Sequence, residues 1–471
     1  MDIIKWIDSQ KDTFTRLSDR VWEFAELGYR ETQSAQVLVE ALEKGGFTIE
    51  RGVAGIPTAF VASYGNAAEP IIAVLGEYDA LPGLSQEAVP VKQPRVEAGA
   101  GHGCGHNLLG VASLAACMAL KEALTSHQVH GMVRYYGCPA EETGAGKAFM
   151  TKAGLFDDVD IAITWHPDAF NGTSGVNFLA NYRVIFKFHG KAAHAAADPF
   201  NGRSALDAVE LMNIGVNYLR EHMIPDARVH YVIINGGGSA PNVVPAEAAS
   251  LYSIRSPRTG QLNELYERVK DIARGAALMT GTELEIVFTS GMSNMLLNDT
   301  IVEVLQEKLE QVGAPKFSAD EQAFARKISE SIPSGSLETM ASYYGLNAAA
   351  LLNMKNDVLH EGILPPFKSE IIQPGSTDVG DVSWAAPTGQ IFAACMALGT
   401  PGHSWQTTAQ GGMGIGHRGM LYAAKVMALA ALEFMQNPGR LKQAKDEFRA
   451  KRDAAAYVSP IPDGTQPPLN G

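Results

Sequence analysis

The stretch IIAVLGEYD, residues 71–79, decides the fold class, because a fully apolar run leads directly into two acidic residues. Residues 71–75 are all apolar and lie between a proline and a glycine, which is typical of a strand buried on both faces. Glu77 and Asp79 follow, so carboxylates are expected where this strand ends. The stretch therefore predicts a parallel sheet with a site beyond the carboxyl end of the strand.

The segments around this strand alternate between helix and strand patterns. Residues 108–124 predict a helix, and residues 132–136 and 159–164 predict strands. Upstream, residues 3–27 and 34–44 predict amphipathic helices. This alternation predicts an α/β domain with a largely parallel sheet.

A second pattern begins at Asn181. Its elements are predicted at residues 182–188 (strand), 205–219 (helix), 227–234 and 248–255 (strands), 262–276 (helix) and 283–289 (strand). This order is the split βαβ, ferredoxin-like arrangement. We therefore expect a first domain of residues 1–180 and 291–471, interrupted by a second domain of residues 181–290. Residues 315–370 have weak periodicity and are expected to form an insertion without a predicted shape.

The net charge narrows the class of partner. The chain has 471 residues, with 38 Lys plus Arg against 51 Asp plus Glu, giving −13. This sign argues against a non-specific binder of nucleic acid or of a membrane surface, because phosphate partners need basic faces. A small anionic substrate remains compatible, since a pocket can be locally basic. We expect a small-molecule substrate, no nucleic acid and no membrane.

The cysteine count and the N-terminus favour a reducing compartment. Four cysteines in a chain of this length do not make a disulfide framework. The first residues show no basic region followed by an apolar run, so no signal peptide is visible. The apolar segment 420–435 is too short to span a membrane and predicts a buried helix. We therefore expect a cytoplasmic protein.

Residue types that bind metal ions follow three of the predicted strands. Glu77 and Asp79 follow the first strand, Glu141 and Glu142 follow the second, and His166 follows the third. Between the first two strands lies the glycine-rich segment GHGCGHN, residues 101–107, which offers a thiolate and an imidazole two residues apart. Divalent metal ions take such nitrogen, sulfur and oxygen ligands. The strand ends should converge, so a metal site is expected there.

Competing motifs are incomplete. The segment GIGHRG, residues 414–419, matches a dinucleotide fingerprint, but no hydrophobic strand precedes it. Gly146 and Lys147 lack the rest of a phosphate-binding loop. The sequence contains no Gly-x-Ser-x-Gly motif, which excludes a serine hydrolase of that type.

Four segments together resemble the metal-dependent amidohydrolases that include glutamate carboxypeptidase, aminoacylase and hippurate hydrolase. They are GEYDALP (76–82), HGCGHN (102–107), PAEE (139–142) and GKAAHA (190–195). The resemblance runs nearly end to end. It implies a zinc-peptidase-like α/β domain interrupted by a ferredoxin-like lid domain that dimerises, in a homodimer or a heterodimer with a related subunit.

The resemblance also implies two divalent metal ions, manganese or zinc, and assigns roles by motif position. The implied metal ligands are Cys104, His106, Glu142, His166 and a late histidine. Glu141 is implied as the general base, and Asp79 as the residue that orients a ligand histidine. One departure concerns Glu77, because many members of the family have a histidine at its position.

Two histidines compete for the late position, His403 and His417. The family's ligand lies well upstream of the last long helix, which is expected to begin near Arg418. His403 fits that spacing, so we predict His403 as the ligand.

Three further residues match family positions in the second domain. His194 is implied to reach the site of a partner subunit and to donate to the oxyanion. Asn242 and Arg255 are implied to bind substrate, and the planar fork of an arginine suits a carboxylate.

The implied activity is hydrolysis of the amide bond of an N-acyl amino acid, with p-aminobenzoyl-glutamate as the first substrate to test. Another acyl-amino acid, such as an indole-acyl-aspartate, or a dipeptide stays open as the substrate. A non-catalytic subunit that supplies its lid to another chain also stays open, although it would have no need for Glu141 beside Glu142.

Overall fold

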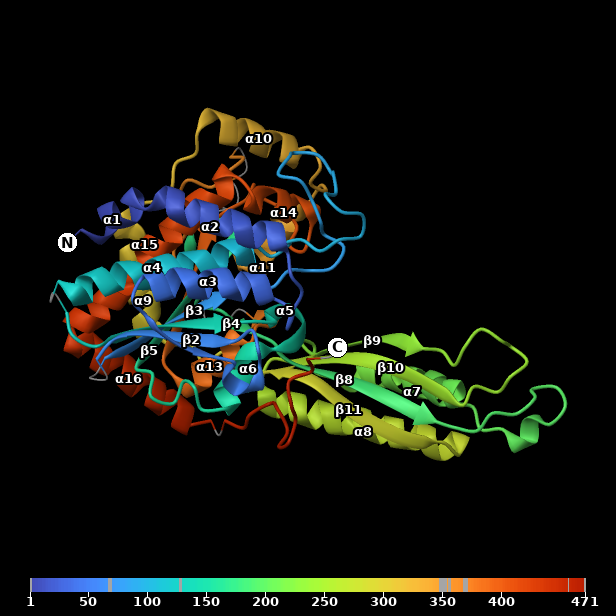
Figure 1. Cartoon of the computed structure of the whole chain (residues 1–471). Helices are drawn as coiled ribbons and strands as arrows, with labels where there is room; N and C mark the ends of the chain where they lie inside the picture. The colour runs from blue at the N-terminus through green and yellow to red at the C-terminus, as the bar shows by residue number, and fades with distance from the viewer. Residues whose placement is uncertain are drawn as a thin grey trace. The chain divides into compact units, whose positions relative to one another are not determined.

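The computed structural model describes residues 2–66, 70–126, 129–346, 354, 357–366, 372–455 and 457–469 (Figure 1). The chain packs into two compact units. The first consists of Met1–Asn177, Met295–Gln373 and Asp381–Val458, and the second of Phe178–Asn294, Pro374–Gly380 and Ser459–Gly471. The second unit thus takes two short segments from the part of the chain beyond residue 291.

A mixed seven-stranded sheet forms the centre of the first unit. Its spatial order is β1 (Thr48–Arg51), β2 (Phe60–Gly65), β4 (Met132–Cys138), β3 (Ile71–Glu77), β5 (Ile161–Asp168), β13 (Thr388–Ala394) and β6 (Gly172–Thr173). The four strands β4, β3, β5 and β13 run parallel, while the remaining neighbours pair antiparallel. Every residue of β3 and of β13 is buried, as expected of strands covered on both faces.

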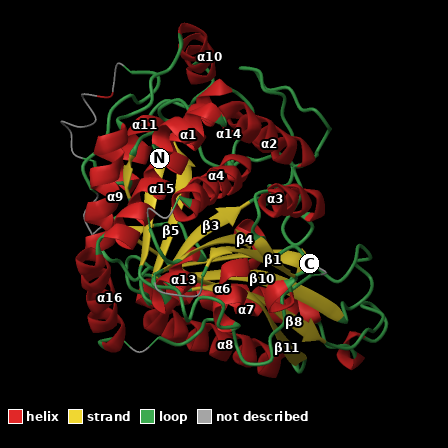
Figure 2. Ribbon diagram, turned by 60° about the vertical axis from the view of Figure 1, so that its left-hand side comes forward, coloured by secondary structure: helices red, strands yellow, loops and turns green. Residues whose placement is uncertain are grey.

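Three long helices, α4, α15 and α9, pack side by side over one face of this sheet (Figures 1 and 2). The helices are α1 (Ile3–Ser9), α2 (Lys11–Phe24), α3 (Thr32–Lys44), α4 (His106–Thr125), α5 (Glu141–Gly144), α6 (Gly146–Lys152), α9 (Asp299–Val312), α10 (Ala319–Ser329), α11 (Ser336–Tyr343), α13 (Val379–Ala385), α14 (Trp405–Gly411), α15 (Gly414–Gln436) and α16 (Pro438–Asp453). Helix α4 is long and apolar enough to cross a membrane, but 78% of its most apolar window is buried inside the fold. It is the central core helix of this unit.

The second unit has its own antiparallel sheet, in the spatial order β11-β8-β10-β9. Along the chain its main elements are β8 (Ala180–His189), α7 (Ala205–Leu219), β9 (Arg228–Asn235), β10 (Glu247–Ser256), α8 (Thr259–Thr280) and β11 (Glu283–Met292). The inward-facing side chains of this sheet, such as Val184 and Phe186, pack against those of the two helices, such as Val209 and Val269. The periodicity of the sequence predicted all six of these elements.

The structure differs from the sequence prediction at two places. The opening helix is two helices, because the backbone at Gln10 leaves the helical path between α1 and α2. The weakly periodic segment 315–370 contains α10 and α11 within its described residues. Helix α10 begins with a capping box between Ser318 and Glu321, a local signal that hydrophobic periodicity does not reveal.

The close packing of β3 gives a test of the core. A β-carbon on Gly76 would lie 2.2 Å from the hydroxyl oxygen of Tyr135, which is fully buried and donates to the carbonyl oxygen of Gly110. Gly76→Ala should therefore cost about 1–3 kcal/mol of stability through overpacking and lower the Tm measured by calorimetry. Gly275→Ala is the control, since no atom of the described residues would lie within 4 Å of a β-carbon there and alanine favours a helix. A Gly76→Ala protein with the wild-type Tm would contradict the packing.

Candidate metal centre

The donor side chains predicted from the first domain come together beyond the carboxyl ends of the parallel strands. Asp79 follows β3, Glu142 follows β4, and His166 lies near the end of β5. Cys104 and His106 lie at the start of α4. Because β3, β4 and β5 are parallel neighbours, their carboxyl ends meet at one edge of the sheet.

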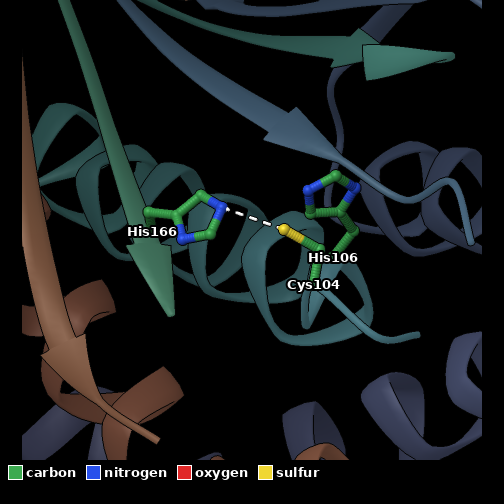
Figure 3. Close-up of side chains that lie close together, drawn as sticks. All are labelled: Cys104, His106 and His166. Carbon is green, nitrogen blue, oxygen red and sulfur yellow. Dashed lines mark hydrogen bonds between the residues drawn. The ribbon is translucent and has the colours of Figure 1, made fainter. Parts of the chain in front are cut away.

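Cys104 lies between two histidines. Its Sγ is 3.3 Å from Nε2 of His166, and Figure 3 shows the ring of His106 beside them. The two imidazole rings are nearly perpendicular, with centroids 6.0 Å apart. One donor atom from each of these three side chains lies within 4.8 Å of the other two.

A second set of donors overlaps the first. Cys104, Glu142 and His403 also lie within 4.8 Å of one another, as do His106, Glu141 and Glu142. Nε2 of His403 is 3.3 Å from Oε2 of Glu142. His403 comes from the loop before α14, and its backbone N–H donates to the carbonyl oxygen of Gly103 at 3.0 Å. This bond ties the late loop to the segment that carries Cys104.

The buried carboxylate of Asp79 serves two of these donors. Its Oδ1 lies 2.8 Å from Nδ1 of His106, and its Oδ2 accepts the backbone N–H of Glu142 at 3.0 Å. With Nδ1 directed at Asp79, Nε2 of His106 is the nitrogen available to a metal ion. Asp79 is therefore placed as the resemblance implied, and it also holds the backbone of Glu142.

Two buried polar atoms make this site fit a metal ion. Among the described residues, Nε2 of His106 and Oε1 of Glu142 find no hydrogen-bond partner, although both atoms are buried. A buried polar atom without a partner is costly, and a bound cation would satisfy both atoms. The donor set of thiolate, imidazole and carboxylate is one that zinc and similar divalent ions accept.

Burial also sets the charge of the histidine donors. Burial, helped by nearby His106, lowers the pKa of His166 to about 4, so that its ring is neutral at pH 7. A neutral imidazole is the form that binds metal ions. Burial raises the pKa of Glu142, which an adjacent cation would reverse.

Two buried residues near the centre were not identified from the sequence. Oε1 of Glu77 lies 2.7 Å from the ammonium group of fully buried Lys147, and its Oε2 lies 3.2 Å from Nε2 of His106. Glu31 is also fully buried and accepts the backbone N–H of Ala140, next to Glu141. A lysine in a Pro- and Gly-bracketed loop after a buried strand was a possible signal for Lys147, but Glu31 had none.

The other candidate for the late ligand lies elsewhere. His417 is in the first turn of α15, and its Nε2 is 2.9 Å from Oδ1 of Asp19. The structure therefore brings His403, and not His417, to the donor groups described above.

The three site residues predicted in the second domain belong to the second unit. His194 is exposed, and its Nδ1 accepts the backbone N–H groups of Ala196 and Ala197 at 3.2 and 3.1 Å. Asn242 is also exposed, and its carbonyl oxygen accepts the N–H of Ala195. Arg255 lies half-buried on β10 and donates to the carbonyl oxygen of Pro374 at 3.1 Å.

An α/β sheet with thiolate, imidazole and carboxylate donors at its carboxyl edge defines a metal-dependent hydrolase class. Residues 73–448 match the sequence profile of peptidase family M20/M25/M40. The chain is 45% identical over 467 residues to one of the subunits of p-aminobenzoyl-glutamate hydrolase from Escherichia coli (strain K12), covering 98% of this chain and 97% of that protein. The chain therefore belongs to peptidase family M20/M25/M40, which confirms the resemblance, and it is a metal-dependent amidohydrolase.

Two further proteins are similar over most of their length. Xaa-Arg dipeptidase of Mus musculus is 30% identical over 460 residues, covering 94% of this chain and 91% of that protein. The crystal structure of the Bacillus subtilis YXEP protein, a dinuclear metal binding peptidase from the M20 family, matches with a TM-score of 0.57 at 16% identity. It covers 91% of this chain and 99% of that chain, and supports the α/β fold.

The two late histidines make a matched pair for mutation. His403→Ala should lower the metal content, measured by elemental analysis after dialysis, because it removes a donor next to Glu142. His417→Ala should keep the metal, because its contact is with Asp19. Greater metal loss in His417→Ala than in His403→Ala would contradict this placement.

Proposed function

We propose that this chain hydrolyses p-aminobenzoyl-glutamate to p-aminobenzoate and glutamate, with two divalent ions, manganese or zinc, held by Cys104, His106, Glu142, His166 and His403. The observation that carries the proposal is the overlap of the donor groups at Cys104, His106 and Glu142. The similarity to the E. coli hydrolase named above supports the choice of substrate.

Bound divalent ions would acidify a water molecule and polarise the scissile carbonyl group. Glu141 is the proposed general base. It precedes Glu142 directly, so a base in that position stands beside a metal ligand and can take the proton of the attacking water. The same carboxyl group then gives this proton to the leaving amine.

His194 is the proposed donor to the oxyanion. Two backbone N–H groups point at its Nδ1, so the neutral ring carries its proton on Nε2. Nε2 is therefore the atom that can donate to a developing negative charge.

Arg255 and Asn242 are the proposed residues for the substrate's amino-acid part. The guanidinium of Arg255 forms hydrogen bonds with Pro374 and Ser253, neither of which carries a negative charge. Burial and nearby Arg183 lower its pKa, which means that a carboxylate there would be favourable. An N-acyl amino acid supplies that carboxylate.

The second unit is proposed as the ferredoxin-like lid of residues 181–290, through which two chains associate. Strand β9 is an edge of its sheet and exposes Val232 at 54%. On α7, Tyr218 is 76% exposed. Exposed apolar side chains on an open edge strand suit pairing with a second chain. A homodimer or a heterodimer with a related subunit is proposed, and the free cysteines accord with a cytoplasmic enzyme.

A dipeptide is the second candidate substrate, because the mouse relative is named a dipeptidase for Xaa-Arg. The decisive experiment is a hydrolysis screen of p-aminobenzoyl-glutamate, indole-acyl-aspartate and Xaa-Arg dipeptides, using the chain expressed alone with manganese or zinc. Release of p-aminobenzoate, detected by chromatography and lost on chelation, is expected. A preference for dipeptides would change the substrate, and metal-loaded protein inactive on all of them would support a non-catalytic subunit.

Glu141→Gln should abolish turnover and leave metal and substrate bound, because it removes a base that acts only in the transition state. The measurements are kcat, metal content and substrate affinity by calorimetry. More than a few per cent of wild-type activity in this variant would rule out Glu141 as the base.

His194→Ala should lower kcat by about 10²–10³, the usual effect of losing an oxyanion donor, while metal content and oligomeric state stay unchanged. If two chains share each site, mixing His194→Ala with Glu141→Gln chains should restore part of the activity. One site of each mixed dimer then has both residues intact. No recovery in mixtures shown to exchange subunits would contradict the shared site.

A further inference from the structure

The loop that carries Glu141 and Glu142 has an unusual backbone. Ala140 and Ala145, the residues that bracket α5, have φ of 57° and 56°, in the left-handed region. Alanine is disfavoured there, because its β-carbon approaches the backbone carbonyl oxygen. Contacts with the rest of the fold must therefore hold this loop in shape.

Two buried carboxyl groups hold the backbone on either side of Glu141. Oε1 of Glu31 accepts the N–H of Ala140 at 2.8 Å, and Oδ2 of Asp79 accepts the N–H of Glu142 at 3.0 Å. The other oxygen of Glu31 accepts the hydroxyl of Thr58 at 2.9 Å, which fixes the carboxyl plane. The backbone on each side of Glu141 is thus fixed by a side chain from a different part of the sequence.

The segment before Glu31 packs against the same loop. The hydroxyl of Tyr29 donates to the carbonyl oxygen of Gly144 at 2.8 Å. A β-carbon on Gly28 would lie 2.6 Å from Oγ1 of Thr143, so only glycine permits this approach. Residues 28–31 therefore contact both ends of the loop.

We propose that Glu31 is a positioning residue for the general base: by binding the N–H of Ala140 it keeps the left-handed turn that directs the carboxyl group of Glu141. The inference rests on the role proposed above for Glu141. Misplacing a catalytic group by about 1 Å can cost about 100-fold in rate, so this contact matters for turnover more than for binding.

Glutamine is a close substitute for Glu31. Burial, together with nearby Asp79, raises the pKa of Glu31 to about 8, so its carboxyl group is largely protonated at pH 7. An amide of the same shape keeps an oxygen that can accept the N–H of Ala140. Aspartate keeps the carboxyl group but is one methylene too short to reach it.

The activity test compares Glu31→Gln, Glu31→Asp and Glu31→Ala in the metal-loaded enzyme, with p-aminobenzoyl-glutamate as substrate. We expect kcat near the wild-type value for Gln and a 10- to 100-fold lower kcat for Asp and Ala, with KM and metal content within about twofold. Glu26→Ala is the matched control. Its carboxylate binds the N–H groups of Gln33 and Ser34 at the start of α3, so its loss destabilises a helix end without touching the loop. We expect it to keep kcat.

Hydrogen exchange tests the same contact without turnover. In a peptide that covers residues 139–146, exchange should be faster in Glu31→Asp and Glu31→Ala than in the wild type, and unchanged in Glu31→Gln and Glu26→Ala. This result in a protein that hydrolyses none of the substrates would keep the positioning contact and reject the proposed function. An active wild type with unchanged exchange and kcat in Asp and Ala would overturn the inference, as would loss of activity explained by loss of metal.

Discussion

The site depends on one buried carboxylate, that of Asp79, whose two oxygens are used by different segments. One faces Nδ1 of His106 at the start of α4, and the other accepts the N–H of Glu142 after β4. A side chain fully removed from water makes both contacts strong and directional, because no solvent competes for its oxygens. Asp79 therefore sets the relative position of a helix and a loop that lie far apart in the sequence, and the donors of both segments follow.

The sequence allowed prediction of elements whose causes are local. The apolar run of residues 71–75 predicted β3, and the strand endings predicted where acidic and histidine donors would meet. His403 was selected by its distance from the last long helix, and the structure places it at Glu142. The roles of these residues in catalysis stay predictions, as do those of His194, Asn242 and Arg255.

What the sequence did not reveal depends on contacts between distant segments. Glu31 precedes α3 like an ordinary helix-start residue, and nothing nearby shows that its carboxyl group turns toward Ala140. Lys147 resembled a fragment of a nucleotide-binding loop, yet its ammonium group is fully buried against Glu77. A buried charge needs a partner, and only the three-dimensional structure identifies that partner.

The position of α4 has a consequence for synthesis on the ribosome. This apolar helix ends at Thr125, whereas α15, which packs against it, begins at Gly414. At about 5–20 residues per second, the ribosome needs roughly 15 to 60 s to make the chain between them. During that time α4 lacks part of its cover, so the first unit cannot finish folding until its last helices emerge. A nascent chain of this kind is a natural client for chaperones that shield apolar segments.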